Sequence, residues 1–230
     1  KIMAVVPAIK VHGANNLLQK MQNVEYNWSI FVRKILTYLN ALHITPGPFT
    51  IFRRKVFENI GKYKHAYLTE DLEMALRMQE NHYKIANSHR SFVFTVAPKT
   101  LKTLYKQRLR WAYGFIKNII DYKHLLFKKE YGDLSMFILP FGVLSIFSAL
   151  FFATNILISN LDRIFRQISK IEMVGVSLHK PEFDLFYLNT SLISVMALFV
   201  LLISLVLILI SIRMSDGKIK VKSELLYFMF

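Results

Sequence analysis

Two long stretches of this chain contain no Asp, Glu, Lys, Arg or His. They cover residues 134–159 and 185–212, and each is at least 26 residues long. A helix of roughly 20 apolar residues can cross the hydrocarbon core of a bilayer, and a charge near its centre costs about 3 kcal/mol on insertion scales. Because 20% of the residues are charged, two such stretches are not expected by chance. The sequence therefore predicts a multi-pass membrane protein with two transmembrane helices in this region.

The charges around these stretches predict how the helices are oriented. Nine Lys and Arg residues lie between positions 99 and 130, and four more follow the second stretch. The intervening segment, residues 160–184, carries four basic and four acidic residues. Basic flanks stay on the cytoplasmic side of a membrane. We therefore expect a protein of the plasma membrane with residues 160–184 outside and both flanking parts in the cytoplasm.

Composition narrows the classes of partner and chemistry. The formal net charge is +15, which suits attraction to anionic lipid headgroups and to an anionic substrate. The sequence shows no nucleic-acid-binding module, so we expect the lipid bilayer, and no nucleic acid, as a partner. The absence of cysteine excludes disulfides, thiolate zinc sites and a cysteine nucleophile within these residues.

The residues before the first apolar stretch show the pattern of an α/β domain. Short segments typical of strands cover residues 1–9 and 91–96, and residues 50–53 fit a short strand or a turn. Apolar residues from Leu17 to Leu39 recur at spacings of three and four, which predicts an amphipathic helix. Two prolines and a glycine between Thr45 and Phe49 must end that helix. Strands that alternate with helices in this way predict an α/β fold.

The tripeptide Thr69-Glu70-Asp71 stands where another helix is expected to begin. Thr69 suits the N-cap position, and acidic residues in a first turn complement the positive end of the helix dipole. This structural role alone would account for the acidic pair. A chemical role stays open beside it, because a carboxylate between a loop and a helix can accept a proton in a cleft.

Residues 98–129 predict an amphipathic helix ahead of the first apolar stretch. Basic residues lie between its apolar positions, as in helices that lie in the plane of a membrane interface. Gln107-Arg108-Leu109-Arg110-Trp111 falls inside it, 36 residues after Asp71. These residues would suit the basic and aromatic flank of a membrane span. They would equally suit an anionic, ring-bearing substrate, because arginine binds phosphate in a bidentate manner.

The order of these motifs resembles a known family. Gly47-Pro48-Phe49 with Arg53-Arg54, then Thr69-Glu70-Asp71, then Gln-x-x-Arg-Trp, then membrane helices, resemble the C-terminal half of family 2 membrane glycosyltransferases. These are the hyaluronan, cellulose, chitin and poly-N-acetylglucosamine synthases. The resemblance spans about residues 10–115. It implies an α/β fold class: the C-terminal portion of a GT-A-type glycosyltransferase domain, followed by an amphipathic interface helix and transmembrane α-helices.

With this resemblance the chain divides into six predicted segments. They are the C-terminal part of a cytoplasmic glycosyltransferase domain (1–98), an interface helix with the Gln-x-x-Arg-Trp motif (99–133), a transmembrane helix (134–159), an external loop (160–184), a second transmembrane helix (185–212), and a cytoplasmic tail with the start of a further span (213–230).

The resemblance implies how a sugar would be transferred. Asp71 would be the general base that deprotonates the acceptor hydroxyl, with Glu70 beside it, and Gln107 and Arg110 would hold the diphosphate of a UDP-sugar donor. Inverting transfer needs one carboxylate base, and a leaving diphosphate needs cationic stabilisation. The implied reaction is therefore that of an inverting hexosyltransferase.

The resemblance also implies an acceptor site. Trp111 would stack against the acceptor sugar, and Gly47, Pro48 and Phe49 would lie next to it. The acceptor would be a growing polysaccharide or a lipid-linked sugar at the cytoplasmic membrane face. The residues do not decide between these two acceptors, and they leave open the donor sugar, processivity, oligomeric state and regulation.

One motif of the family does not occur in these 230 residues. There is no Asp-x-Asp sequence, and in the family that motif precedes the region seen here and binds the metal and UDP. We therefore expect Mg²⁺ or Mn²⁺ as a cofactor, with its ligands upstream of Lys1. We also expect this fragment alone to be inactive.

The alternative is a non-catalytic membrane protein, either a transporter subunit or a scaffold, with a glycosyltransferase-like cytoplasmic domain. Ionisable residues inside the spans would favour a transporter, and neither apolar stretch has one. Loss of Asp71 or Trp111 would favour a scaffold, and both residues are present. A glycosyltransferase is therefore the main hypothesis.

Overall fold

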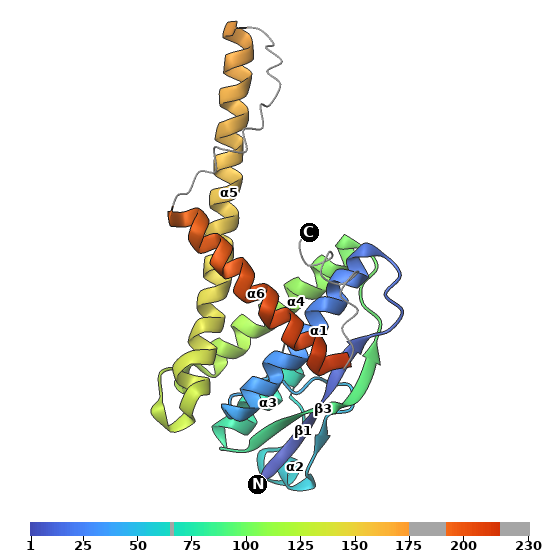
Figure 1. Ribbon diagram of the computed structural model, residues 1–230. Helices are drawn as coiled ribbons and strands as arrows, with labels where there is room; N and C mark the ends of the chain where they lie inside the picture. The colour runs from blue at the N-terminus through green and yellow to red at the C-terminus, as the bar shows by residue number, and fades with distance from the viewer. Residues whose placement is uncertain (65–66, 175–191, 217–230) are drawn as a thin grey trace. The chain divides into compact units, whose positions relative to one another are not determined.

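The computed structural model describes residues 1–64, 67–174 and 192–216 (Figure 1). The chain forms two compact units. One contains residues 1–141 and the segment that begins at Ser204, and the other contains residues 142–203. The first unit holds the sheet and every candidate site residue.

The sheet of the described residues has three strands in the order β2-β1-β3. The central strand β1 (Ile2–Val11) runs parallel to β3 (Lys84–Thr95) and antiparallel to the short β2 (Ile51–Phe52). The three predicted strand segments are therefore confirmed. β3 begins earlier than predicted: its first half is largely polar and carries no clear strand pattern in the sequence, yet Ile85 and Asn87 in it are buried. There, the buried Asn87 donates from Nδ2 to the carbonyl of Val6 at 3.2 Å.

Pro7 lies inside the central strand. The register between β1 and β3 shifts at this point, from Pro7 opposite Ser88 to Ala8 opposite Phe92. Proline has no N–H to donate to a ladder and is found at bulges for that reason. The strand therefore accommodates Pro7 through an irregular register and continues beyond it.

α1 (Leu17–Tyr38) packs against β1 and β3 (Figure 1). Alternate residues of β1, Ala4, Val6 and Ala8, are at most 1% exposed, as expected for the strand face that a helix covers. The helix begins at Asn16, whose side chain accepts the N–H of Gln19 at 2.8 Å. The predicted long helix is therefore confirmed, and its apolar stripe forms one side of the core.

Polar side chains at the start of α1 hold the segment that leads into α4 (Leu101–Asp121). Three consecutive carbonyls, those of residues 97–99, each accept a hydrogen bond of 2.9 Å from Asn16, Gln19 or Gln22. Gln19 and Gln22 are 1% and 3% exposed. Because buried hydrogen bonds of this kind are costly to break, α1 determines where α4 begins.

α3 (Glu70–Glu80) is almost completely enclosed. Every residue from Leu72 to Gln79 is buried, and the helix contacts β3, α4 and α2 (Arg54–Ile60). The enclosed residues include Glu73 and Arg77. Buried charges need partners, and those partners come from the neighbouring elements described below.

One helix of the described residues is long and apolar enough to cross a bilayer. It begins with a π-helical turn, Leu134–Ile138, and continues as α5 (Leu139–Val174). Within Leu134–Ser169 the mean hydropathy reaches 2.2. The helix does not end at Ser159 as predicted, and the first part of the predicted external loop is helical. Residues 160–174 contain neither Gly nor Pro, so nothing in the sequence breaks the helix there.

α6 (Leu192–Asp216) contains the described part of the second predicted span. Residues 185–191 of that prediction lie outside the described residues. The described apolar stretch, Leu198–Ser211, is shorter than a bilayer-crossing helix, so the second span stays a prediction. Near the end of α6, the hydroxyl of Ser211 donates to the carbonyl of Asn27 in α1 at 2.7 Å.

Candidate functional site

Asp71 lies in the first turn of α3 and is tied to the loop that precedes β2. Its backbone carbonyl accepts two hydrogen bonds from Thr45, one from the N–H at 3.2 Å and one from the Oγ1 hydroxyl at 2.8 Å. Thr45 is completely buried. The Oδ1 atom of Asp71 accepts the N–H of Leu72 at 2.9 Å. The start of α3 and the end of this loop are therefore held together at Asp71.

The Asp71 carboxyl is partly buried, and its surroundings raise its pKa. Burial is the main cause, and the adjacent Glu70 carboxylate raises the pKa further. The N–H of Leu72 and the Arg110 guanidinium act in the opposite direction. A carboxylate with a raised pKa is a stronger base, so this is the kind of environment in which a general base is expected.

Two further groups lie close enough to Asp71 to interact with its charge. Burial lowers the pKa of Arg33 on α1, and the charges of Tyr26 and Asp71 oppose that shift. Burial raises the pKa of Tyr63, and the charges of Asp71 and Glu70 add to that rise. Arg33 is thus a second cation within electrostatic range of the carboxylate. Sequence reasoning missed it because Arg33 lies 38 positions before Asp71 in an ordinary amphipathic helix.

α4 presents the Gln-x-x-Arg-Trp residues on one side. Gln107, Arg110 and Trp111 stand three and four positions apart and so share a face of the helix. Arg110 is exposed, and Trp111 is 37% exposed. The Oε1 atom of Gln107 is buried and has no hydrogen-bond partner among the described residues. Such an unpaired polar atom calls for an explanation, and a bound ligand that supplies the partner would be one.

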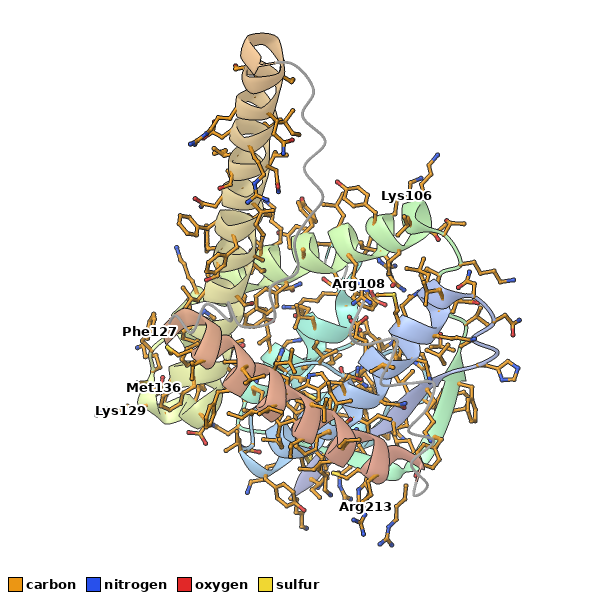
Figure 2. All side chains as sticks on the ribbon, turned by 45° about the horizontal axis from the view of Figure 1, so that its top comes forward. Lys106, Arg108, Phe127, Lys129, Met136 and Arg213 are labelled. Carbon is orange, nitrogen blue, oxygen red and sulfur yellow. The ribbon has the colours of Figure 1, made fainter. Side chains whose placement is uncertain are left out.

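Arg108 connects this motif to α1. Its guanidinium donates to both carboxylate oxygens of Glu25, at 2.6 Å and 2.5 Å. Its central carbon lies 4.6 Å from the centre of the Trp111 ring. Figure 2 shows Arg108 pointing from α4 towards α1. The bidentate pair orients the guanidinium, which in turn covers one face of the indole. Only the opposite face of Trp111 could stack against a ring-bearing ligand.

α3 and α4 are in contact where α3 begins. The side-chain amide of Asn118 donates to Oγ1 of Thr69 at 2.9 Å and to the carbonyl of Gly114 at 2.7 Å. Just before Thr69, Tyr67 makes an edge-on ring contact with Tyr113, with centroids 6.1 Å apart. Thr69 occupies the predicted N-cap position, but its side chain makes no capping hydrogen bond. Its hydroxyl accepts from Asn118 instead, and the predicted N-cap position of Thr69 is confirmed.

A buried ion pair within α3 lies further along the helix and is bonded to Tyr122, the residue that follows α4. Glu73 and Arg77, with side chains 5% and 6% exposed, pair at 2.9 Å. The Tyr122 hydroxyl donates to Glu73 at 2.6 Å, and burial together with this bond raises the pKa of Tyr122. Arg77 also donates to the carbonyls of Ile60 and Lys62, at 2.7 Å and 3.0 Å. α3 is therefore attached to α4 on one side and to the end of α2 on the other.

The Gly-Pro-Phe segment lies at the surface, on the loop that Thr45 ties to Asp71. Gly47, Pro48 and Phe49 are all exposed, and Phe49 has a positive φ of 54°. Phe49 lines a groove of about 500 Å³ together with residues of β1, β2 and β3. Thr45, at the start of this loop, is thus bonded to Asp71, while the Phe49 side chain lies beside the sheet.

Comparison with known proteins identifies the family. The model of Glycosyl transferase family group 2 matches residues 3–214. The chain belongs to glycosyltransferase family 2. Over 115 residues, half of the chain, it is 27% identical to the poly-beta-1,6-N-acetyl-D-glucosamine synthase of Staphylococcus epidermidis and 28% identical to that of Staphylococcus aureus strain COL. This stretch covers 28% of the length of each of these relatives.

Family 2 membership confirms the resemblance found in the sequence. The structure brings Asp71 and Arg110 within electrostatic reach of each other and places Gln107 and Trp111 on the same face as Arg110. The catalytic, donor-binding and acceptor-binding roles of these residues stay predictions. Sequence reasoning missed Asn118. Its spacing could have indicated it: Asn118 follows Gln107 by 11 positions, or three helical turns, and so lies on the same face of the helix.

The metal site of the family has no counterpart among the described residues. No group of three His, Asp or Glu side chains in this part of the chain could hold a metal ion. Asp71 and Glu70 alone do not form such a site, because divalent cations of this class take several oxygen ligands at once. The residues present therefore do not fit a bound Mg²⁺ or Mn²⁺ by themselves.

Proposed function

We propose that this family 2 protein is an inverting glycosyltransferase. It transfers a sugar from a UDP-sugar to a growing polysaccharide or a lipid-linked acceptor at the cytoplasmic face of the plasma membrane. The observation that carries the proposal is the pairing of α3 with α4, which sets the partly buried carboxylate of Asp71 in the field of Arg110. A base next to a cation is what transfer from a nucleotide diphosphate requires.

In this mechanism Asp71 takes the proton of the acceptor hydroxyl as that oxygen attacks the anomeric carbon of the donor sugar. The bond from that carbon to the diphosphate oxygen breaks on the opposite side, so the configuration inverts. The diphosphate leaves with the bonding electron pair. Arg110 and Gln107 stabilise its charge from α4. The raised pKa of Asp71 makes it a better proton acceptor.

The acceptor sugar is held by the remaining motif residues. Trp111 offers it one face of its ring, because Arg108 covers the other. The loop that carries Gly47, Pro48 and Phe49 lies next to the acceptor through its bond to Asp71. These contacts would bring the acceptor hydroxyl within reach of the base.

Two features support a location at the membrane. α5 is long and apolar enough to cross a bilayer. On α4, a row of exposed apolar residues lies on the side opposite Gln107, and basic residues lie beside it. Helices of this kind lie in the plane of the interface. The residues of the row are Leu101, Tyr105, Leu109, Tyr113, Ile116 and Ile120.

The test uses the full-length protein in membrane vesicles with Mg²⁺ or Mn²⁺ and a panel of UDP-sugars. UDP-N-acetylglucosamine comes first, because the relatives named above are synthases of an N-acetylglucosamine polymer. UDP release and incorporation of labelled sugar are measured for the wild type and for Asp71→Asn. Glu58→Gln, an exposed carboxylate on α2 paired with Arg54, is the control.

We expect the wild type and Glu58→Gln to turn over one sugar. Asp71→Asn should lose activity by about 10²-fold to 10⁴-fold, the contribution of a general base, while UDP still binds. A wild type that is silent with every donor would overturn the proposal. Undiminished turnover by Asp71→Asn would remove Asp71 from its role.

A further inference from the structure

The contact between Thr69 and α4 leaves no room for a side chain at position 114. A Cβ atom on Gly114 would lie 2.2 Å from Oγ1, 2.3 Å from Cγ2 and 2.8 Å from Cβ of Thr69. Such approaches are well inside van der Waals contact. Gly114 therefore lets the backbone of α4 reach the start of α3, and any larger residue must push Thr69 away.

Asn118 lies one turn after Gly114 on α4 and donates a hydrogen bond to Thr69. The close approach of the two segments at Gly114 makes this bond possible. The Asn118 amide donates to Oγ1 of Thr69 and to the carbonyl of Gly114. Asn118 is completely buried and Thr69 is 6% exposed. Because water does not reach this contact, a lost hydrogen bond cannot be replaced by solvent.

The same contact joins two motifs that are far apart in the sequence. Thr69 precedes Asp71 by two residues. Gln107, Trp111, Gly114 and Asn118 follow one another at spacings of four, three and four along one face of α4. Residues on one continuous helix move together. The contact between α4 and Thr69 therefore also sets the position of Asp71 relative to the Gln-x-x-Arg-Trp residues.

We propose that Gly114 and Asn118 are positioning residues for the transfer reaction. They set the location of Asp71 relative to Gln107 and Arg110 by holding Thr69 against α4, and neither touches the substrates. This inference rests on the proposed function. A displacement of about 1 Å at a reacting group can reduce a rate by about 100-fold, so a contact this close to the base has a direct effect on turnover.

The test measures kcat, the Kd for UDP and the thermal unfolding temperature of the full-length protein in vesicles or detergent. Asn118→Ala removes the donor, and Thr69→Val removes the acceptor while it keeps the shape of the side chain. Thr69→Ser keeps the hydroxyl. Asn160→Ala is the matched control, because Asn160 makes the same bond to the carbonyl four residues back, on the exposed surface of α5.

We expect kcat to fall about 10-fold to 100-fold in Asn118→Ala and in Thr69→Val. The Kd for UDP should stay unchanged, because Gln107 and Arg110 remain in place on α4. The double variant should be no slower than Asn118→Ala, because that single variant already removes the hydrogen bond that Thr69→Val removes. Thr69→Ser and Asn160→Ala should retain wild-type kcat. Gly114→Ala should lower kcat at least as much as Asn118→Ala.

Wild-type kcat in Asn118→Ala and Thr69→Val would overturn the inference and leave the proposed function intact, provided that Asp71→Asn is inactive. A parallel loss of kcat, UDP binding and thermal stability in these variants would show a merely structural contact and would also overturn it. Failure of the proposed function differs from both outcomes, because the wild type would then turn over none of the UDP-sugars, and failure of the role of Asp71 would leave Asp71→Asn as fast as the wild type.

Discussion

At the level of single residues, the Asp71 carboxyl is partly buried. This burial affects the free energy of unfolding as well as the basicity of the carboxylate. Burial raises its pKa above the ordinary range, so the folded protein binds this proton more tightly than the unfolded chain does. The resulting stabilisation is complete at low pH and is lost as the pH rises from the ordinary value through the raised pKa. At neutral pH the buried Asp71 carboxyl therefore lowers the free energy of unfolding.

Replacement of Asp71 by Asn should stabilise the protein while it abolishes transfer. The amide carries no charge to desolvate, and its oxygen can still accept the N–H of Leu72. We expect the thermal unfolding temperature of Asp71→Asn to exceed that of the wild type by a few degrees at neutral pH. Scanning calorimetry below the ordinary carboxyl pKa should show no difference. A variant less stable than the wild type at neutral pH would contradict this account.

At the level of helices and strands, the site depends on the contacts that hold α3 in place. Asp71, the candidate base, lies on this helix, and so do the residues that bond it to its neighbours. α4 contacts it at Thr69 and at Glu73, and the end of α2 contacts it at Arg77. α1 in turn holds the residues that lead into α4. Short-range patterns predict α1, α3 and α4, but they predict neither α2 nor the polar contacts between these helices.

The pair of Glu73 and Arg77 provides the prediction at this scale. Arg77→Met leaves Glu73 buried with the Tyr122 hydroxyl and the distant Lys64, at 3.9 Å, as its remaining partners. Loss of one member of a buried pair typically costs about 3–5 kcal/mol, and we expect the free energy of unfolding to fall by that amount. Urea unfolding in detergent, followed by tryptophan fluorescence, measures it.

Arg54→Met is the control for that experiment. Arg54 also pairs with a carboxylate four residues away, but its side chain is 92% exposed. Exposed pairs contribute at most about 1 kcal/mol, so this variant should unfold almost as the wild type does. Equal effects of the two substitutions would show that burial of the pair is not what matters.

At the scale of the whole molecule, α5 is long and apolar enough to cross a bilayer, and the charges around it predict an orientation. The charge pattern predicts that residues 160–184 are outside the cell and that the segment before α5 is inside. α5 extends through residues 160–174, so Arg163 and Arg166 lie on the same helix as the predicted span. Arginine can extend its long side chain to the interface from the end of such a helix.

Cysteine labelling tests this topology directly, since these residues contain no cysteine. In a background without other cysteines, Arg166→Cys should react with a membrane-impermeant maleimide in intact cells. Lys128→Cys should react only after the cells are permeabilised. Both positions are exposed on the protein surface. The reverse pattern would invert the topology and exclude transfer at the cytoplasmic face.

Patterns along the sequence are enough to assign the class of this protein. Charge-free stretches showed where a helix could cross a bilayer, helical and strand periodicities showed the α/β pattern, and the spacing of Thr-Glu-Asp from Gln-x-x-Arg-Trp pointed to glycosyltransferase family 2. These signals are local or depend on the order of motifs along the chain. They do not depend on contacts between residues that are distant in the sequence.

The polar contacts of Thr69 and Asp71 arise from packing between distant segments. Arg33, Thr45 and Asn118 are polar residues in unremarkable local sequence, separated from the Thr-Glu-Asp motif by 24 residues or more. Their importance comes from burial and from hydrogen bonds that form when α1, the loop before β2 and α4 pack together. A hydrogen bond between distant segments leaves no periodic trace in a sequence, because its geometry arises only when the helices and strands have taken their places.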